Sequence, residues 1–243
     1  MILLAAIVAL TNVLGTVSVD TCGARVVSYI PVGGEEVFFM SETGTGGMPL
    51  CWPWFGELGP AVDSRRHGVA RYHDFEVLAA TNCTPRSSEM VLRLVSNAHM
   101  RREFPYEFVL IVSIRLTDRL AVSMTGENTG QKPFRVTEAF HPYFAVGDSL
   151  TCCVYGVDAP ESRLVDSVSG MSLALTCEGG GFRVWRPNPE SHLSKIVSAL
   201  APDDWKKFIC VEGGVFSEGC AYVLKPGESH TLLMSCVPVS HCL

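Results

Sequence analysis

The stretch YEFVLIVSIRLTDRLAVSMTGEN, residues 106–128, indicates the fold class of this chain. Its segment LIVSIRL (residues 110–116) alternates apolar and polar side chains, and VLRLV (residues 91–95) does the same. A two-residue period is typical of strands that are buried on one face, and β-branched residues favour pleated backbone. Both segments therefore predict β-strands.

Short β-rich runs broken by Gly, Pro, Asn and Asp recur outward from this stretch in both directions. They are residues 15–21, 24–40, 89–97, 172–185, 206–214 and 229–239. Turn signals at such intervals are typical of β-sandwiches and barrels. The best helix candidate is Glu190 to Leu200, which ends at Ala201-Pro202. No repeat or linker interrupts the pattern, so we predict an all-β chain, a large antiparallel β-sandwich that forms a single domain over residues 1–243.

The bulk composition limits the classes of partner. The 243 residues include 47% hydrophobic and 18% charged residues, which is ample for one core and gives no sign of disorder. The net charge is −6, and no Lys/Arg stripe offers the phosphate contacts that nucleic-acid binding requires. A small-molecule ligand is the class of partner that these numbers leave open.

The apolar start, MILLAAIVAL, resembles a signal peptide but lacks a basic segment before it. It leads directly into residues 10–30, LTNVLGTVSVDTCGARVVSYI, which we interpret as two strands around a turn. A ten-residue run is too short to span a bilayer, and no other stretch is long enough. We therefore predict a first β-strand and no membrane association.

The ten cysteines do not have the spacing of a disulfide framework. Most of them lie in apolar runs, Cys152 and Cys153 are adjacent and should point to opposite faces of a strand, and no CxxC motif suggests zinc. We interpret them as small buried hydrophobic residues with free thiols, which implies a reducing compartment and a cytoplasmic protein.

Three parts of the chain depart from ordinary strand composition: GGMPLCWPWFG (residues 46–56) with HGVAR (67–71), EAFHPYF (138–144) and ICVEGG (209–214). The aromatic cluster Trp52-Pro53-Trp54-Phe55 fits either a core plug or a platform on which a sugar ring stacks.

Two ionisable residues in these parts have both structural and functional explanations. His141 lies among aromatic neighbours, which favours partial burial over a surface position. Glu212 follows an apolar run, so it either faces solvent at a strand end or is buried, and a buried carboxylate needs a partner or a ligand.

Together these segments resemble the aldose 1-epimerase superfamily, in particular its glucose-6-phosphate 1-epimerase (hexose-6-phosphate mutarotase) branch. The matching segments, in the family's order, are GGMPLCWPWFG, HGVAR, GENTGQKPFRVTEAFHPYFAVGD (126–148), VWRP (184–187), FICVEGG (208–214) and VLKPGES (223–229). The resemblance covers nearly the whole chain. It implies a galactose mutarotase-like supersandwich with the sugar on its open face.

The resemblance also implies roles for individual residues. Glu212 would be the general base that takes the anomeric proton, His141 the general acid that protonates the ring oxygen, and His67 a second histidine that orients the sugar. This division suits ring opening of a hemiacetal, which needs one group to remove a proton while another donates one. Arg71 is the implied ligand-binding cation, and the further candidates for substrate binding are Trp52, Trp54, Phe55, Tyr143 and Arg186. No metal or organic cofactor is implied, and we expect a monomer that binds a sugar or sugar phosphate.

Three positions depart from the family pattern. Thr45 stands where the phosphosugar branch has an arginine, Arg186 replaces the asparagine of Trp-Asn-Pro, and Ala199 aligns with a usual aspartate. Arg186 or the pair Arg65-Arg66 is a candidate substitute for the lost phosphate contact. These losses favour a non-catalytic carbohydrate-binding relative, whereas the retained acid–base residues favour an enzyme that interconverts sugar anomers. A structural sandwich that binds only protein is the third class.

Overall fold

The computed structural model describes residues 6–57, 59–60, 64–191 and 200–239, and its regular structure is almost entirely antiparallel β-sheet. Short 3-10 helices lie between strands at η1 (Ala70–Tyr72), η2 (Met100–Arg102) and η4 (Asp204–Lys206). The helix predicted from Glu190 to Leu200 lies mostly outside the described residues. No helix within the described ranges is long and apolar enough to cross a membrane.

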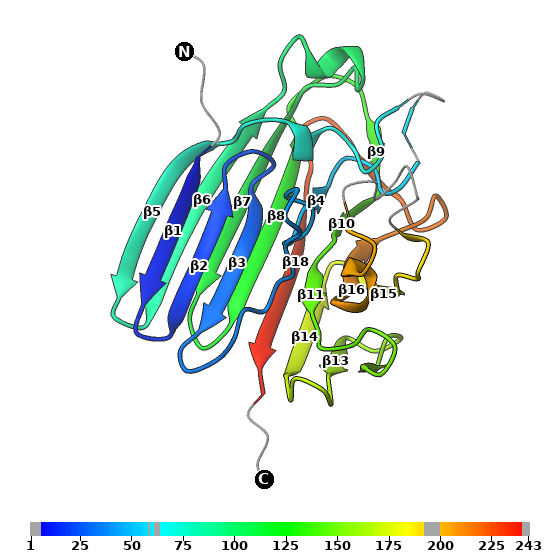
Figure 1. The fold of residues 1–243 in the computed structure, drawn as a ribbon. Coiled ribbons are helices and arrows are strands. Elements are labelled where there is room, and N and C mark those ends of the chain that lie inside the picture. Colours follow the sequence, from blue (N-terminus) through cyan, green and yellow to red (C-terminus); the bar gives the residue numbers. More distant parts are fainter. Residues whose placement is uncertain (1–5, 58, 61–63, 192–199, 240–243) are drawn as a thin grey trace.

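An eight-stranded antiparallel sheet forms the back layer (Figure 1). Its strands, in spatial order, are β12 (Cys153–Tyr155), β13 (Glu161–Val165), β14 (Ser172–Glu178), β18 (Ser229–Pro238), β8 (Leu120–Asn128), β7 (Phe108–Leu116), β6 (Ser87–Val95) and β5 (Glu76–Thr84). In β7 the side chains of Leu110, Val112 and Ile114 are fully buried, whereas those between them are partly exposed. The two-residue period in LIVSIRL therefore predicted both the strand and its buried face.

A three-stranded sheet covers the β5–β8 half of the back layer. It consists of β1 (Ile7–Asn12), β2 (Gly15–Asp20) and β3 (Arg25–Pro31), which are the predicted first strand in the apolar start and the two strands predicted in residues 10–30. A reversal between Asn12 and Gly15 joins β1 to β2, and there the Leu14 N–H donates to Asn12 Oδ1 at 2.8 Å. An Asn side chain that binds the backbone two residues on stabilises such a turn.

A five-stranded sheet covers the other half, over β14 and β18 (Figure 1). Its strands are β4 (Leu50–Cys51), β10 (Glu138–Phe140), β11 (Tyr143–Ala145), β15 (Gly181–Trp185) and β16 (Phe208–Val215). The central strand β16 pairs with β15 along one edge and with β10 and then β11 along the other. Every residue of β16 is buried, so both faces of this strand are covered. A separate pair of strands, β9 (Phe134–Val136) and β17 (Tyr222–Leu224), lies beside it.

The cysteines are only partly the buried residues that the sequence predicts. Among the described residues all nine have free thiols, and five of them are buried: Cys51, Cys152, Cys177, Cys210 and Cys236. The prediction of burial is wrong for the exposed Cys83, Cys153 and Cys220. Adjacent Cys152 and Cys153 do differ, one buried and one exposed, as neighbours in an extended segment should.

Candidate active site

The two-residue period of β16 decides which of its side chains can meet a ligand. Ile209 and Val211 belong to the core between the layers, whereas Phe208 and Cys210 pack in a separate cluster on the opposite face. Glu212 shares the parity of that second, outward face. There it lines a cavity of about 1100 Å³, together with His141 and His67. The structure thus brings the three residues that the sequence singled out for acid–base chemistry into one cavity.

His141 and Glu212 are in direct contact. His141 Nε2 lies 3.0 Å from Glu212 Oε1, and the two residues are only 7% and 2% exposed. His141 Nδ1 and Glu212 Oε2 are buried, and neither atom has a hydrogen-bond partner among the described residues. A buried polar atom without a partner is costly, so each is a strong candidate to bind a polar group of a ligand.

The ring of His141 is held by aromatic neighbours. Tyr143 stacks on it with ring centroids 5.2 Å apart and planes 19° apart, and Trp185 contacts it at 6.3 Å. The backbone N–H of His141 donates to Pro49 O at 3.0 Å, which ties the residue to the segment before β4. These contacts fix where the imidazole can point.

His67 occupies left-handed backbone, with φ at +66°, which few non-glycine residues adopt. Its N–H donates to Gly56 O at 2.7 Å, and the Gly56 N–H donates back to His67 Nδ1 at 3.1 Å. The imidazole lies edge-on to that of His141, with ring centroids 5.3 Å apart. A strained residue held by reciprocal hydrogen bonds and aimed at a cavity is a feature of functional sites.

His67 is neutral. Burial, followed by the positive charges of His141 and of Arg71, lowers the pKa of His67 from 6.5 to about 2. The Gly56 N–H donates to Nδ1 and the Arg66 Nε–H donates to Nε2 at 3.1 Å, so both ring nitrogens face donors of the protein. A neutral imidazole can accept at only one nitrogen, so one of these two contacts is given up whichever nitrogen carries the proton.

Two arginines in the cavity wall have no carboxylate partner among the described residues. Arg71 comes from η1 and Arg183 from β15. Among the described residues, both side chains contact aromatic rings: the Arg71 guanidinium lies 5.9 Å from the centre of the Tyr72 ring, and that of Arg183 lies 5.5 Å from the centre of the Phe55 ring. Arg66, by contrast, pairs with Glu57 at 3.4 Å.

The aromatic cluster divides between the core and the cavity. Phe55 lines the cavity, with its ring 5.0 Å from that of His67. Trp52 is fully buried against Phe108, with centroids 4.5 Å apart, and Trp54 is 2% exposed. Neither indole reaches the cavity, so the prediction of a sugar contact is wrong for both tryptophans. They are the core plug that was the alternative interpretation.

Arg186 also lies outside the cavity. Its guanidinium donates to Ser149 O and to Cys152 O, which ties the end of β15 to the segment before β12. The predicted role in substrate binding is therefore corrected to a structural one. Tyr143, in contrast, lines the cavity as expected.

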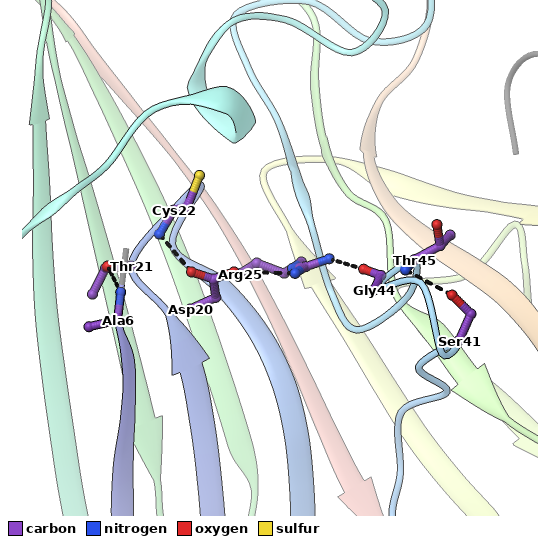
Figure 2. Close-up of polar contacts among 8 residues, drawn as sticks. All are labelled: Ala6, Asp20, Thr21, Cys22, Arg25, Ser41, Gly44 and Thr45. Carbon is purple, nitrogen blue, oxygen red and sulfur yellow. Dashed lines mark hydrogen bonds and ion pairs between the residues drawn. The ribbon is translucent and has the colours of Figure 1, made fainter. Parts of the chain in front are cut away.

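Position 45 lies in a turn, and Thr45 is not among the described residues of the cavity wall. The Thr45 N–H donates to Ser41 Oγ at 2.9 Å (Figure 2). The nearby Arg25 binds Asp20 Oδ2 at 3.2 Å and Gly44 O at 2.7 Å, so its guanidinium is engaged within the fold. Ala199, the third departure, lies outside the described residues.

Sequence reasoning missed Arg183, although the signal was present. In a strand, residues two apart share a face, so Arg183 lies on the side of Trp185, whereas Arg186 points away. Choosing the arginine by parity rather than by its place in the family motif would have found it. Within the described ranges, no group of three or more His, Cys, Asp or Glu residues is arranged to hold a metal ion.

Comparison with known proteins gives matches of three kinds. The family model described as aldose 1-epimerase matches residues 7–159. A Salmonella typhimurium protein named "Putative glucose-6-phosphate 1-epimerase" is 32% identical over 167 residues, which are 65% of this chain and 53% of that protein. An Escherichia coli K12 protein of the same name is 26% identical over 240 residues, 81% of this chain and 78% of that protein. The chain thus matches about half the length of the first relative and more of the second.

Among solved structures, a "putative mutarotase" from Salmonella typhimurium superposes with a TM-score of 0.86 at 21% identity, covering 97% of this chain and 90% of that chain. A galactose mutarotase-like protein from Lactobacillus casei gives a TM-score of 0.76 at 17% identity, covering 96% and 100%. At these identities the likeness concerns the fold, and it confirms the predicted galactose mutarotase-like sandwich.

Proposed function

The chain belongs to the aldose 1-epimerase family, and on that premise we propose that it is a mutarotase, which interconverts the α and β anomers of an aldohexose 6-phosphate. The observation that supports this most directly is the His141–Glu212 contact of 3.0 Å at the cavity wall, with one buried polar atom on each side chain left without a described partner. A base and an acid side by side are what anomerisation requires.

In the proposed mechanism Glu212 removes the proton from the anomeric hydroxyl, O1, through its unpartnered Oε2. His141 donates a proton to the ring oxygen, O5, as the C1–O5 bond breaks, and C1 becomes an aldehyde carbon. After rotation about C1–C2 the same proton transfers run in reverse: O5 returns its proton to His141 and attacks the other face of C1, while Glu212 returns a proton to O1. No proton is gained or lost over the cycle, so no additional reactant is needed.

His67 would hold the sugar in the orientation that these proton transfers require. Its imidazole lies at the cavity wall, edge-on to that of His141, where it is placed to contact a sugar oxygen. Phe55 and Tyr143 supply aromatic surface on which a pyranose ring can pack. These groups would orient the substrate and would not exchange protons with it.

The phosphate part of the proposal rests on charge and on the names of relatives. Arg71 lines the cavity without a described carboxylate partner, and it is therefore able to bind an anion. The Salmonella and Escherichia coli relatives share a name that specifies glucose 6-phosphate. A guanidinium that pairs with a phosphate makes a charge-assisted, two-pronged contact.

The test is an anomerisation assay on freshly dissolved α-glucose, α-galactose and α-glucose 6-phosphate, followed by proton NMR. The proposal predicts that the protein accelerates equilibration well beyond the buffer reaction, with the phosphorylated sugar the preferred substrate. Binding of these sugars without any acceleration would instead identify a non-catalytic relative. Acceleration of the free sugars alone would remove the phosphate from the proposal and keep the acid–base pair.

A further inference from the structure

Arg183 is placed next to the proposed base by strand register. It pairs across β15 and β16 with Glu212, and strand parity puts both side chains on the cavity face. Side chains directly opposite each other in an antiparallel pair have Cβ atoms about 5 Å apart. The base of the Arg183 side chain therefore lies beside that of Glu212, on the edge of the cavity away from His67 and Arg71.

The backbone beyond Glu212 leaves room for the arginine to extend inward. Gly181, Gly214 and Ala139 follow one another across β15, β16 and β10. A Cβ on Gly214 would lie 2.6 Å from Ala139 Cβ, so this row is closely packed and has no large side chain. The Arg183 guanidinium reaches a position 5.5 Å over the Phe55 ring.

The hydrogen-bonding capacity of Arg183 is unused in this part of the chain. A guanidinium has five N–H donors, and none of those of Arg183 binds a carboxylate or carbonyl among the described residues. Other arginines near the cavity are neutralised, Arg66 by Glu57 and Arg135 by Glu218. Arg183 is exposed to solvent, so its guanidinium is accessible to an anionic ligand.

Arg71 and Arg183 both contribute positive charge to the same region of the cavity, beside His67. They come from different elements, η1 and β15, and both contribute positive charge that disfavours protonation of His67. An anionic group bound near His67 would thus lie within the field of both guanidiniums. Two cations provide more charge than a neutral sugar requires.

We propose that Arg183 is a specificity-determining residue that binds the phosphate of the substrate together with Arg71. This inference rests on the proposed function, since it assumes that the cavity binds a sugar phosphate. The proposed phosphate site would thus have one arginine from β15 and one from the HGVAR segment, on opposite sides of the His141–Glu212 pair.

The experiment compares Arg183→Gln and Arg183→Lys with the unsubstituted protein, using Arg115→Gln as the matched control. Arg115 pairs with Glu89 away from the cavity, on the back layer, so its loss tests the effect of removing one arginine charge alone. For each protein, KM and kcat are measured with α-glucose 6-phosphate and with α-glucose, and the dissociation constant of inorganic phosphate is measured by calorimetry.

We expect Arg183→Gln to raise KM for glucose 6-phosphate and the dissociation constant of phosphate by about 10- to 100-fold, because a hydrogen bond to a charged group is lost. KM for free glucose should change by less than about twofold. Arg183→Lys should recover part of the loss, and Arg115→Gln should match the unsubstituted protein.

The role of Arg183 would be overturned if Arg183→Gln raised KM equally for glucose 6-phosphate and for glucose. It would also be overturned if this variant bound inorganic phosphate as tightly as the unsubstituted protein. Failure of the proposed function gives a different result, namely no acceleration of either sugar by the unsubstituted protein. In that case the phosphate calorimetry still decides whether Arg183 binds the anion. A normal denaturation midpoint for each variant excludes misfolding as the cause of a loss.

Discussion

Acid should destabilise this protein through His67. Burial of the ring, followed by the positive charges of His141 and Arg71, holds His67 in its neutral form, and its pKa falls from 6.5 to about 2 on folding. The unfolded chain therefore binds a proton below pH 6.5 that the folded chain does not bind. Stability that is present above this pH is lost as the pH falls from 6.5 towards 2.

The magnitude follows from the same pKa values. Each pH unit between 6.5 and the folded pKa costs about 1.4 kcal/mol, so at about pH 5 the loss through His67 alone is about 2 kcal/mol. His67→Asn should remove this loss. Asparagine tolerates the positive φ better than most residues, and its Oδ1 can accept the Gly56 N–H in place of Nδ1.

The assay is urea unfolding at about pH 7.5 and about pH 5 for the unsubstituted protein, His67→Asn and, as a control, His99→Asn at an exposed site. The unsubstituted protein and the control should each lose about 2 kcal/mol more on acidification than His67→Asn does. If all three lose the same free energy of unfolding, the fold does not hold His67 in its neutral form.

Three further predictions follow from the site and from the thiols. His141→Asn should lower the anomerisation rate by about 100-fold or more with little change in sugar affinity, because the acid for O5 is gone; an unchanged rate in the NMR assay would exclude His141 as that acid. Arg71→Ala should weaken binding of glucose 6-phosphate far more than of glucose in calorimetry, whereas equal losses would assign Arg71 to the ring hydroxyls or to the fold. Titration of the denatured, unreduced protein should detect all ten thiols of the sequence, and a lower number would reveal disulfides.

The sheet layers could be predicted from the sequence where a strand has one buried face. In LIVSIRL the alternation itself reports which side chains are buried, and Leu110, Val112 and Ile114 are fully buried. The first strand was predicted in the apolar start, but its end at Asn12 could not be located because Val13 and Leu14 are apolar and continue the pattern of the strand. The turn depends on one side-chain hydrogen bond from Asn12, which hydrophobic periodicity does not report.

The site could be predicted only in part, because composition does not show which face of a strand a side chain occupies. Trp52 and Phe55 come from the same short segment, yet one indole is enclosed in the core and the other ring lines the cavity. The contact between His141 and Glu212 joins residues 71 positions apart, so only the pairing of β10 and β11 with β16 brings them together. The alternation of side chains along β15 would have identified Arg183, and not Arg186, as the arginine on the cavity face.

The central claim is that the buried carboxylate of Glu212 takes the anomeric proton, and the most direct measurement compares Glu212→Gln with the unsubstituted protein. Glutamine keeps the shape of the side chain but cannot accept that proton. The anomerisation rate of α-glucose 6-phosphate, followed by NMR, should fall by about 100-fold or more while sugar affinity changes little. A substituted protein that turns over as fast as the original would contradict the account, whatever else the cavity binds.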